Sequence, residues 1–147
     1  ADSVYLTKQI IGKWIISSIK RSNGNDYNSF VSAKEYYFEE DGRFFEIFDD
    51  DTSTGKWEFK NPSVGEITFE LDQPRYMITN KEVLKYFDEE VLKSITIKSG
   101  FKRIYKLDKS VLTFFTFIYV SMMDAASINS HHRLLLLNYK KEKDTSR

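Results

Sequence analysis

Apolar and polar residues alternate along most of this chain, in short runs that end at turn-forming residues. The clearest cases are WEFK at 57–60 and EITFELD at 66–72, where every second residue is apolar. A period of two places the apolar side chains on one face of a strand. Counting comparable runs predicts about nine or ten short strands. The further runs lie at 13–20, 35–40, 43–48, 75–79, 94–98, 101–107, 111–120 and 133–140.

Tight turns separate many of these runs. Asp41-Gly42 stands between EYYFEE and RFFEIF, and Asp-Gly between alternating runs is a strong hairpin signal. Ser99-Gly100 and the segment 108–110 predict further turns. Short connections of this kind join strands that are adjacent and antiparallel.

Two segments follow a helical period instead. Residues 2–11 predict a short helical turn that ends at Gly12. Thr79 to Glu82 has the form of a capping box, and Leu84, Phe87 and Val91 recur behind it at three and four residues. We therefore expect one short helix at 81–91, inserted between strands.

The pattern as a whole predicts an all-β, antiparallel up-and-down fold, either a closed barrel or a sandwich. A barrel has no exposed strand edges to invite aggregation. Aromatic residues make up 16% of the chain and proline occurs twice, a composition that favours strands. Residues 1–140 are expected to form a single domain, and the charged segment 141–147 a disordered tail.

Charge and composition exclude several classes of function. The chain has 22 basic and 22 acidic residues, whereas nucleic-acid binders usually carry a basic excess. The absence of cysteine excludes disulfides, thiolate metal sites and cysteine nucleophiles. No apolar run reaches the roughly 18 residues of a transmembrane helix, so no transmembrane span is expected.

The only two tryptophans occur in the same tripeptide, Gly-Lys-Trp, at 12–14 and 55–57. A short helical turn followed by Gly-x-Trp on the first strand resembles the lipocalin and wider calycin pattern. That resemblance implies that Trp14 packs at the closed end of a barrel, against an arginine near the last strand. Arg133 is the matching residue here, and Gly12 lets the chain turn sharply into the strand.

The middle of the chain extends the resemblance. EYYFEEDGRFFEIF at 35–48, followed by GKWEF at 55–59, is similar to small bacterial lipocalin-like domains. The resemblance implies an antiparallel up-and-down β-barrel of 8–10 strands, and the one inserted helix at 81–91 departs from the family pattern. The resemblance also implies a non-enzymatic binding protein of the bacterial cell envelope, periplasmic or associated with the outer membrane. A first residue other than Met agrees with an exported, mature protein or a lipoprotein.

Large aromatic side chains are expected to face the interior and to contact a small hydrophobic or aromatic ligand, since an eight-stranded barrel is just wide enough for one. The same side chains could instead fill the barrel as a solid core. The residues predicted to bind ligand are Phe45, Trp57, Phe59, Phe69, Phe115, Phe117 and Tyr119, with Ile47 on the same face as Phe45.

Other candidate sites are weaker. Asp49-Asp50-Asp51 lacks the spacing of an EF-hand and is better explained as a solvated loop. His131 and His132 would point to opposite faces of a strand, so they do not make one metal site, although one could ligate haem. No hydrolase elbow, phosphate loop or zinc-protease motif occurs. We expect no enzyme activity, no metal and no cofactor.

The alternative function is a protein-interaction module, an accessory subunit of a cell-envelope assembly with a filled barrel. Its docking surface would be the helix at 81–91 or the loop at 121–130. Met122 and Met123 in that loop are adaptable apolar side chains suited to a partner contact. A cavity in the barrel would favour a ligand carrier, and a packed interior beside an exposed apolar patch would favour the module.

Overall fold

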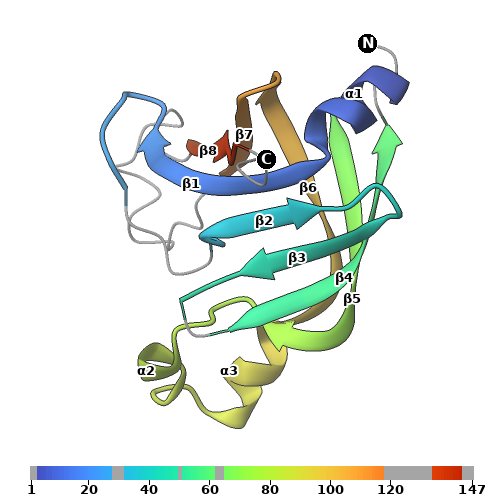
Figure 1. Cartoon of the computed structure of the whole chain (residues 1–147). Helices are drawn as coiled ribbons and strands as arrows, with labels where there is room; N and C mark the ends of the chain where they lie inside the picture. Colours follow the sequence, from blue (N-terminus) through green and yellow to red (C-terminus); the bar gives the residue numbers. More distant parts are fainter. Residues whose placement is uncertain (1–2, 28–31, 50, 62–64, 118–133, 144–147) are drawn as a thin grey trace.

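The structure, a computed structural model, describes residues 3–27, 32–49, 51–61, 65–117 and 134–143. Its helices and strands follow the order predicted from the sequence (Figure 1). They are α1 Ser3–Ile10, β1 Gly12–Arg21, β2 Glu35–Phe38, β3 Arg43–Ile47, β4 Thr52–Asn61, β5 Glu66–Tyr76, α2 Lys81–Leu84, α3 Glu89–Ser94, β6 Thr96–Leu107, β7 Val111–Phe117 and β8 Leu134–Lys141.

The strands form a closed antiparallel barrel. Each pairs with the next along the chain, and β1 pairs with β8 to close the sheet. The predicted fold class is therefore confirmed, with eight strands among the described residues. Closure leaves no edge strand, as the hairpin pattern implied. Among these residues, no helix is long and apolar enough to cross a membrane.

The two ends of the barrel differ. Helix α1 lies at one end, hereafter the α1 end, and α2 and α3 lie at the other, hereafter the insert end (Figure 1). The β2–β3 and β6–β7 hairpins turn at the α1 end through short connections at 39–42 and 108–110. The longer β5–β6 connection, which contains both inserted helices, is at the insert end.

Trp14 is the centre of the packing at the α1 end. Its side chain is fully buried, and its Nε1 donates a hydrogen bond to the carbonyl of Ile10 at 2.8 Å. The Lys141 ammonium lies 5.3 Å from the centre of the ring. Trp14 thus packs at the α1 end with Lys141 as the described cation on its ring, and its predicted packing against an arginine stays a prediction. Arg133 lies outside the described residues.

Lys141 also corrects the predicted boundary of the tail. It belongs to β8, and its Nζ donates to the carbonyl of Gln9 at 3.1 Å. The next residue, Glu142, donates its backbone N–H to the carbonyl of Lys13. A side chain on Gly12, whose φ is +129°, would collide with the Lys141 stem. The strand thus continues beyond residue 140 because the chain is anchored to β1 and α1.

The second Gly-Lys-Trp has a related role. Trp57 packs edge-on against Phe38, with ring centres 5.4 Å apart, and its Nε1 donates to the carbonyl of Glu39 at 3.1 Å. A Cβ on Gly55 would collide with the backbone carbonyl of Glu70. The glycine is needed because β4 and β5 approach too closely there for any side chain.

Two predicted strand breaks are absent. Strand β5 runs through Pro74, with a large irregularity between Glu70 and Arg75 in its pairing with β6. Strand β6 likewise runs through Ser99-Gly100, which was expected to be a turn. Gly100 pairs with Phe69, and a Cβ on it would lie 2.9 Å from the Phe69 ring. Here glycine makes room for a packed aromatic ring.

The predicted helix at 81–91 is two short helices. Asn80 caps α2 by accepting hydrogen bonds from the N–H groups of Glu82 and Val83. Asp88 adopts an extended conformation and caps α3 by accepting from the N–H of Val91 at 2.9 Å. The single-helix prediction is wrong because the Asp88 side chain starts a new helix within the periodic segment.

The predicted inward faces of β3 and β7 are also wrong. In β3, Phe44 and Glu46 are buried, and the alternating positions Phe45 and Ile47 are only partly buried. In β7, Leu112 and Phe114 are buried, whereas Phe117 is 64% exposed. Both strands carry apolar residues on both faces, so alternation alone does not fix which face is inside. Phe115, half-buried, alternates with Phe114 and belongs to the outer face.

Candidate functional site

The barrel wall splits between β6 and β7 at the insert end. Pairing of these strands extends from Leu107–Leu112 to Arg103–Phe115 and stops there. Beyond that point Phe117 stays paired with β8, and Lys102 stays paired with β5. The two strands therefore separate toward the insert end, which leaves a gap in the wall.

A cavity of about 380 Å³ occupies this gap. That volume lies within the roughly 300–1,000 Å³ typical of small-molecule sites. Most of the described lining is apolar or aromatic, and its charged members are two cations. The described lining residues are Ser32, Tyr36, Phe101, Lys102, Arg103, Phe114, Phe115, Thr116, Phe117 and Leu137.

A buried ionic cluster lies beside the cavity. Glu46 on β3 is fully buried, and Arg75 on β5 donates to its Oε2 through Nε at 3.0 Å and Nη2 at 2.7 Å. The ammonium of Lys102 on β6 lies 3.3 Å from Oε1 of the same carboxylate. Oε1 has no hydrogen-bond partner, so the carboxylate is only partly satisfied.

Aromatic rings surround both cations. The Lys102 ammonium lies 4.9 Å from the ring centre of Tyr36, 5.1 Å from Phe69 and 6.0 Å from Phe114. Arg75 stacks over Phe48 at 4.9 Å. Ring faces carry partial negative charge, so they partly replace the water that these cations lose. The Lys102 side chain is 20% exposed and lines the cavity.

The neighbouring tyrosines remain neutral. Burial raises the pKa of Tyr36 well above its usual value, and the nearby Glu46 carboxylate raises it further. Burial likewise raises the pKa of Tyr139, whose hydroxyl donates to the carbonyl of Ala33 at 2.7 Å. The formal charge of the cluster is therefore set by Glu46, Arg75 and Lys102 alone, one negative and two positive groups.

Sequence reasoning did not identify these three residues. The prediction that Phe45 and Ile47 face inward would place Glu46, which lies between them, on the outer face. The register of the Asp41-Gly42 hairpin holds the missing signal, since it pairs Phe38 with Phe44 and Tyr36 with Glu46. With Tyr36 inside, Glu46 must be inside as well. Arg75 and Lys102 carried no signal in isolation.

The residues predicted to bind ligand fall into three groups. Phe69 contacts the Lys102 ammonium, and Phe115 and Phe117 line the cavity. Trp57 and Phe59 pack on each other at 5.8 Å within the core, and neither lines the cavity. Phe45 packs at 5.9 Å against Tyr37, which is 40% exposed, on the outer face. Tyr119 lies outside the described residues.

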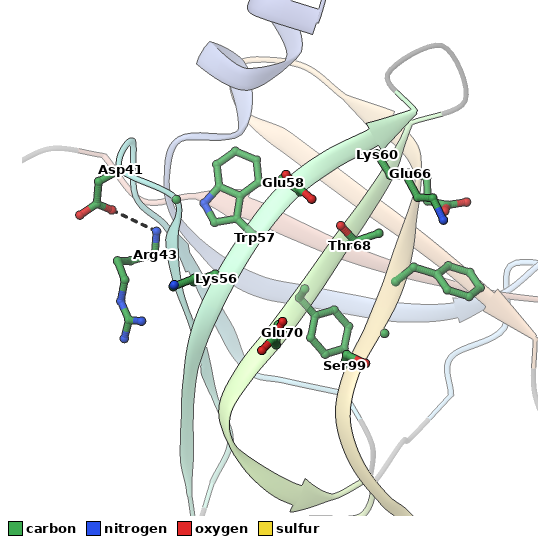
Figure 2. A pocket seen from close by; sticks show the side chains of 14 residues that line it. Asp41, Arg43, Lys56, Trp57, Glu58, Lys60, Glu66, Thr68, Glu70 and Ser99 are labelled. Carbon is green, nitrogen blue, oxygen red and sulfur yellow. Dashed lines mark hydrogen bonds between the residues drawn. The ribbon is translucent and has the colours of Figure 1, made fainter.

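A larger hollow of about 710 Å³ lies on the outer face of β4, β5 and β6 (Figure 2). Its charged side chains are of both signs: Lys56 lies opposite Glu70 in the register of β4 and β5, and Arg43 at its rim forms an ion pair with Asp72 at 2.8 Å. Such a self-neutralised polar wall gives no net attraction for a charged or an apolar ligand. The cavity at the β6–β7 gap is the better candidate.

Metal ligation finds no support within the described part of the chain. These residues contain no group of three or more His, Cys, Asp or Glu that could hold an ion. The histidines 131 and 132, the segment 121–130 and Asp50 lie outside it.

Comparison with known proteins adds little beyond the fold. No family model matches the chain, and no curated protein matches it. One similar solved structure is a lipocalin-like protein from Bacteroides uniformis ATCC 8492, with 14% identity and a TM-score of 0.48 over 91% of this chain and 99% of that one. Another is an uncharacterized protein from Bacteroides eggerthii DSM 20697, with 12% identity and a TM-score of 0.45 over 90% and 98%. The fold is lipocalin-like on the evidence of its own closed eight-stranded meander.

Proposed function

We propose that this chain is a non-enzymatic, lipocalin-like binding protein that holds a small hydrophobic or aromatic ligand at the insert end of its barrel. The observation that carries the proposal is the 380 Å³ cavity where β6 and β7 separate. Four phenylalanines line it, and the described parts of β6 and β7 separate there, which would give a ligand a route into the barrel. Burial of its apolar surface would supply most of the binding free energy.

The proposal is tested by finding a ligand and then blocking the cavity. Native mass spectrometry of gently purified protein, compared with the denatured mass, detects a bound molecule. The same measurement is repeated after incubation with haem, fatty acids and sterols. A ligand recovered chemically intact supports binding without catalysis. A bare mass under all these conditions would contradict the proposal.

A blocking variant locates the site. Thr116 lines the cavity and is exposed, so Thr116→Trp places a bulky ring in the mouth without disturbing the core. Tyr105 is 63% exposed and outside the described lining, which makes Tyr105→Trp the matched control. We expect Thr116→Trp to weaken ligand affinity at least tenfold, which corresponds to roughly 1.4 kcal/mol. Tyr105→Trp should leave the affinity unchanged.

We propose an extracytoplasmic location in a bacterial envelope, periplasmic or associated with the outer membrane. The support is the similarity of the Gly-Lys-Trp and Asp-Gly hairpin segments to bacterial lipocalin-like domains. Fractionation of cells that express the full-length gene product tests it. Recovery in the cytoplasmic fraction would overturn this part of the proposal.

The second candidate is the protein-interaction module. Neither α2 nor α3 has a buried residue, and the Tyr86 side chain between them is 81% exposed. Val91 on α3 and Met77 before α2 are also exposed. Helices that bury nothing on their own barrel are available to a partner. Two results together would favour this function. The natural protein would carry no bound small molecule, and it would bind a defined protein partner that the Tyr86→Ser variant does not bind.

A further inference from the structure

Among the described residues, the interior of the insert end carries one more positive charge than negative. Glu46 is fully buried, and the side chains of Arg75 and Lys102 are 10% and 20% exposed. One carboxylate faces two cations, because burial keeps both neighbouring tyrosines neutral. An uncompensated charge among apolar side chains is costly, and proteins pair such charges. This site therefore favours an additional anion.

Lys102 shares the Glu46 carboxylate with Arg75 and lies farther from it, at 3.3 Å against 2.7 Å. Arg75 has both Nε and Nη2 on a single carboxylate oxygen, so its charge is matched by Glu46. The Lys102 ammonium has three N–H donors, and within the described part of the chain its one ion-pair partner is Glu46, whose Oε1 lies 3.3 Å away. Lys102 also lines both the β6–β7 cavity and a smaller hollow under β5 and β6. Lys102 thus lies beside both spaces that a ligand could occupy.

The other charged residue of the cavity lining has the same sign. Arg103 is half exposed, stacks on Phe101 at 5.3 Å and lies 3.8 Å from Glu66. Glu46 and Glu66 each lie beside one of these cations, but the described lining of the cavity itself contains no carboxylate. The aromatic residues of the same wall suit a body that is apolar. An acidic head and an apolar body together define an amphiphile.

We infer that the ligand is an apolar or aromatic molecule with a single carboxylate, which the Lys102 ammonium binds. This inference rests on the proposed function and names its ligand class. The carboxylate supplies the one negative charge that the cluster lacks. Glu46 and Arg75 position the lysine: their pair fixes Oε1 beside the ammonium and directs it toward the cavity. A doubly charged head group would exceed the single charge available.

Matched acids and alcohols test the inference directly. Decanoate is compared with decanol, and 1-naphthylacetate with 1-naphthaleneethanol, by isothermal titration calorimetry on the full chain at pH 7. Each pair shares an apolar body and differs in the charged head. We expect each acid to bind roughly 10- to 100-fold more tightly than its alcohol, as a charged hydrogen bond contributes.

Variants of two lysines on the same strand assign the effect. Lys102→Met keeps the length of the side chain and removes its charge. Lys98 on β6 is exposed and lines neither hollow, so Lys98→Met is the control with the same change in net charge. Lys102→Met should weaken acid binding roughly 10- to 100-fold and change alcohol binding less than about threefold. Lys98→Met should change neither.

The outcomes separate the two proposals. Failure of both acids and both alcohols to bind would overturn the carrier function itself. Equal binding of acid and alcohol to the natural protein would overturn only the carboxylate inference, and this comparison does not depend on any variant folding. Loss of acid binding to the same extent in Lys98→Met would attribute the effect to net charge and overturn the assignment to Lys102.

Discussion

Glu46 shows why a buried charge in this barrel is informative. Its carboxylate is fully buried, and it holds a guanidinium and an ammonium from two other strands. A buried ion pair rarely stabilises a protein more than apolar residues of the same volume would. Glu46, Arg75 and Lys102 are therefore better explained by what they present to the cavity than by a contribution to the stability of the core.

Removing the carboxylate charge should nevertheless be costly. In Glu46→Gln two buried cations would face each other without a counterion, and we expect the free energy of unfolding to fall by about 3–5 kcal/mol. Urea unfolding followed by tryptophan fluorescence measures the change. Glu70→Gln, an exposed carboxylate on β5, is the control and should be nearly neutral. An unaltered urea midpoint in Glu46→Gln would contradict the conclusion that the Glu46 carboxylate neutralises the two buried cations.

The exposed ion pair between Arg43 and Asp72 predicts that the stability of the fold depends on pH. Hydrogen bonds from Arg43 and Thr54 lower the pKa of Asp72 from 3.8 to about 2. Since the folded-state pKa lies below the unfolded one, the pair stabilises the fold above about pH 4. That contribution is lost as the pH falls toward about 2.

Urea midpoints of the natural protein and Asp72→Asn, measured between pH 5 and pH 2, check this prediction. The natural protein should be the more stable at pH 5, and the difference should shrink steadily as the pH is lowered through this range. A difference that stays constant or grows toward pH 2 would show that the carboxylate charge is not responsible.

At the scale of elements, the sequence predicted which strands and helices form, and their order, better than it predicted which face of each strand lies inside the barrel. The Asp41-Gly42 hairpin and the alternation in β4 and β5 were sufficient because only one face of each strand is apolar. Strands β3 and β7 carry aromatic residues on both faces, so Phe45 and Phe115 were assigned to the wrong side. Cross-strand register decides such cases, and register is set by the hairpin turn.

Glycine gave a second kind of ambiguity. The same residue type makes a turn at Gly42, with φ +93°, and admits a neighbouring element at Gly55 and Gly100. Local sequence does not separate these uses, because the crowding atoms come from another strand. The candidate site was missed for a related reason: Glu46, Arg75 and Lys102 come from three strands and meet only in the folded barrel.

The close approach of β4 and β5 makes Gly55 sensitive to substitution. In Gly55→Ala the new methyl group would collide with the Glu70 carbonyl, and the strands would have to separate. We expect a loss of about 1–3 kcal/mol in the free energy of unfolding. Thermal or urea unfolding measures it, and Lys56→Ala, the exposed neighbour, serves as control. Equal stability of the two variants would show that the β4–β5 contact is looser than it is in this structure.

For the whole molecule, the structure separates stability from binding by position. The α1 end is closed by buried rings and by hydrogen bonds from both tryptophans to backbone carbonyls. The insert end has a split wall, a cavity and an excess cation. Rigid packing at the α1 end supports the site at the insert end. The charges of that site add little to the stability of the fold.

This division predicts opposite effects at the two ends. Trp57→Phe replaces the packed indole with a smaller ring and removes the hydrogen bond to the Glu39 carbonyl. We expect the free energy of unfolding to fall by about 1–3 kcal/mol. Ligand affinity should stay within about threefold of that of the natural protein. Lys102→Met removes the excess charge and should leave stability equal or higher, because Glu46 keeps Arg75 as its partner. Urea unfolding and calorimetric binding of decanoate are measured on both variants. If Trp57→Phe abolished binding in folded protein, or if Lys102→Met destabilised the barrel as strongly as Glu46→Gln, the two ends would be coupled. The lysine would then belong to the structural core of the barrel.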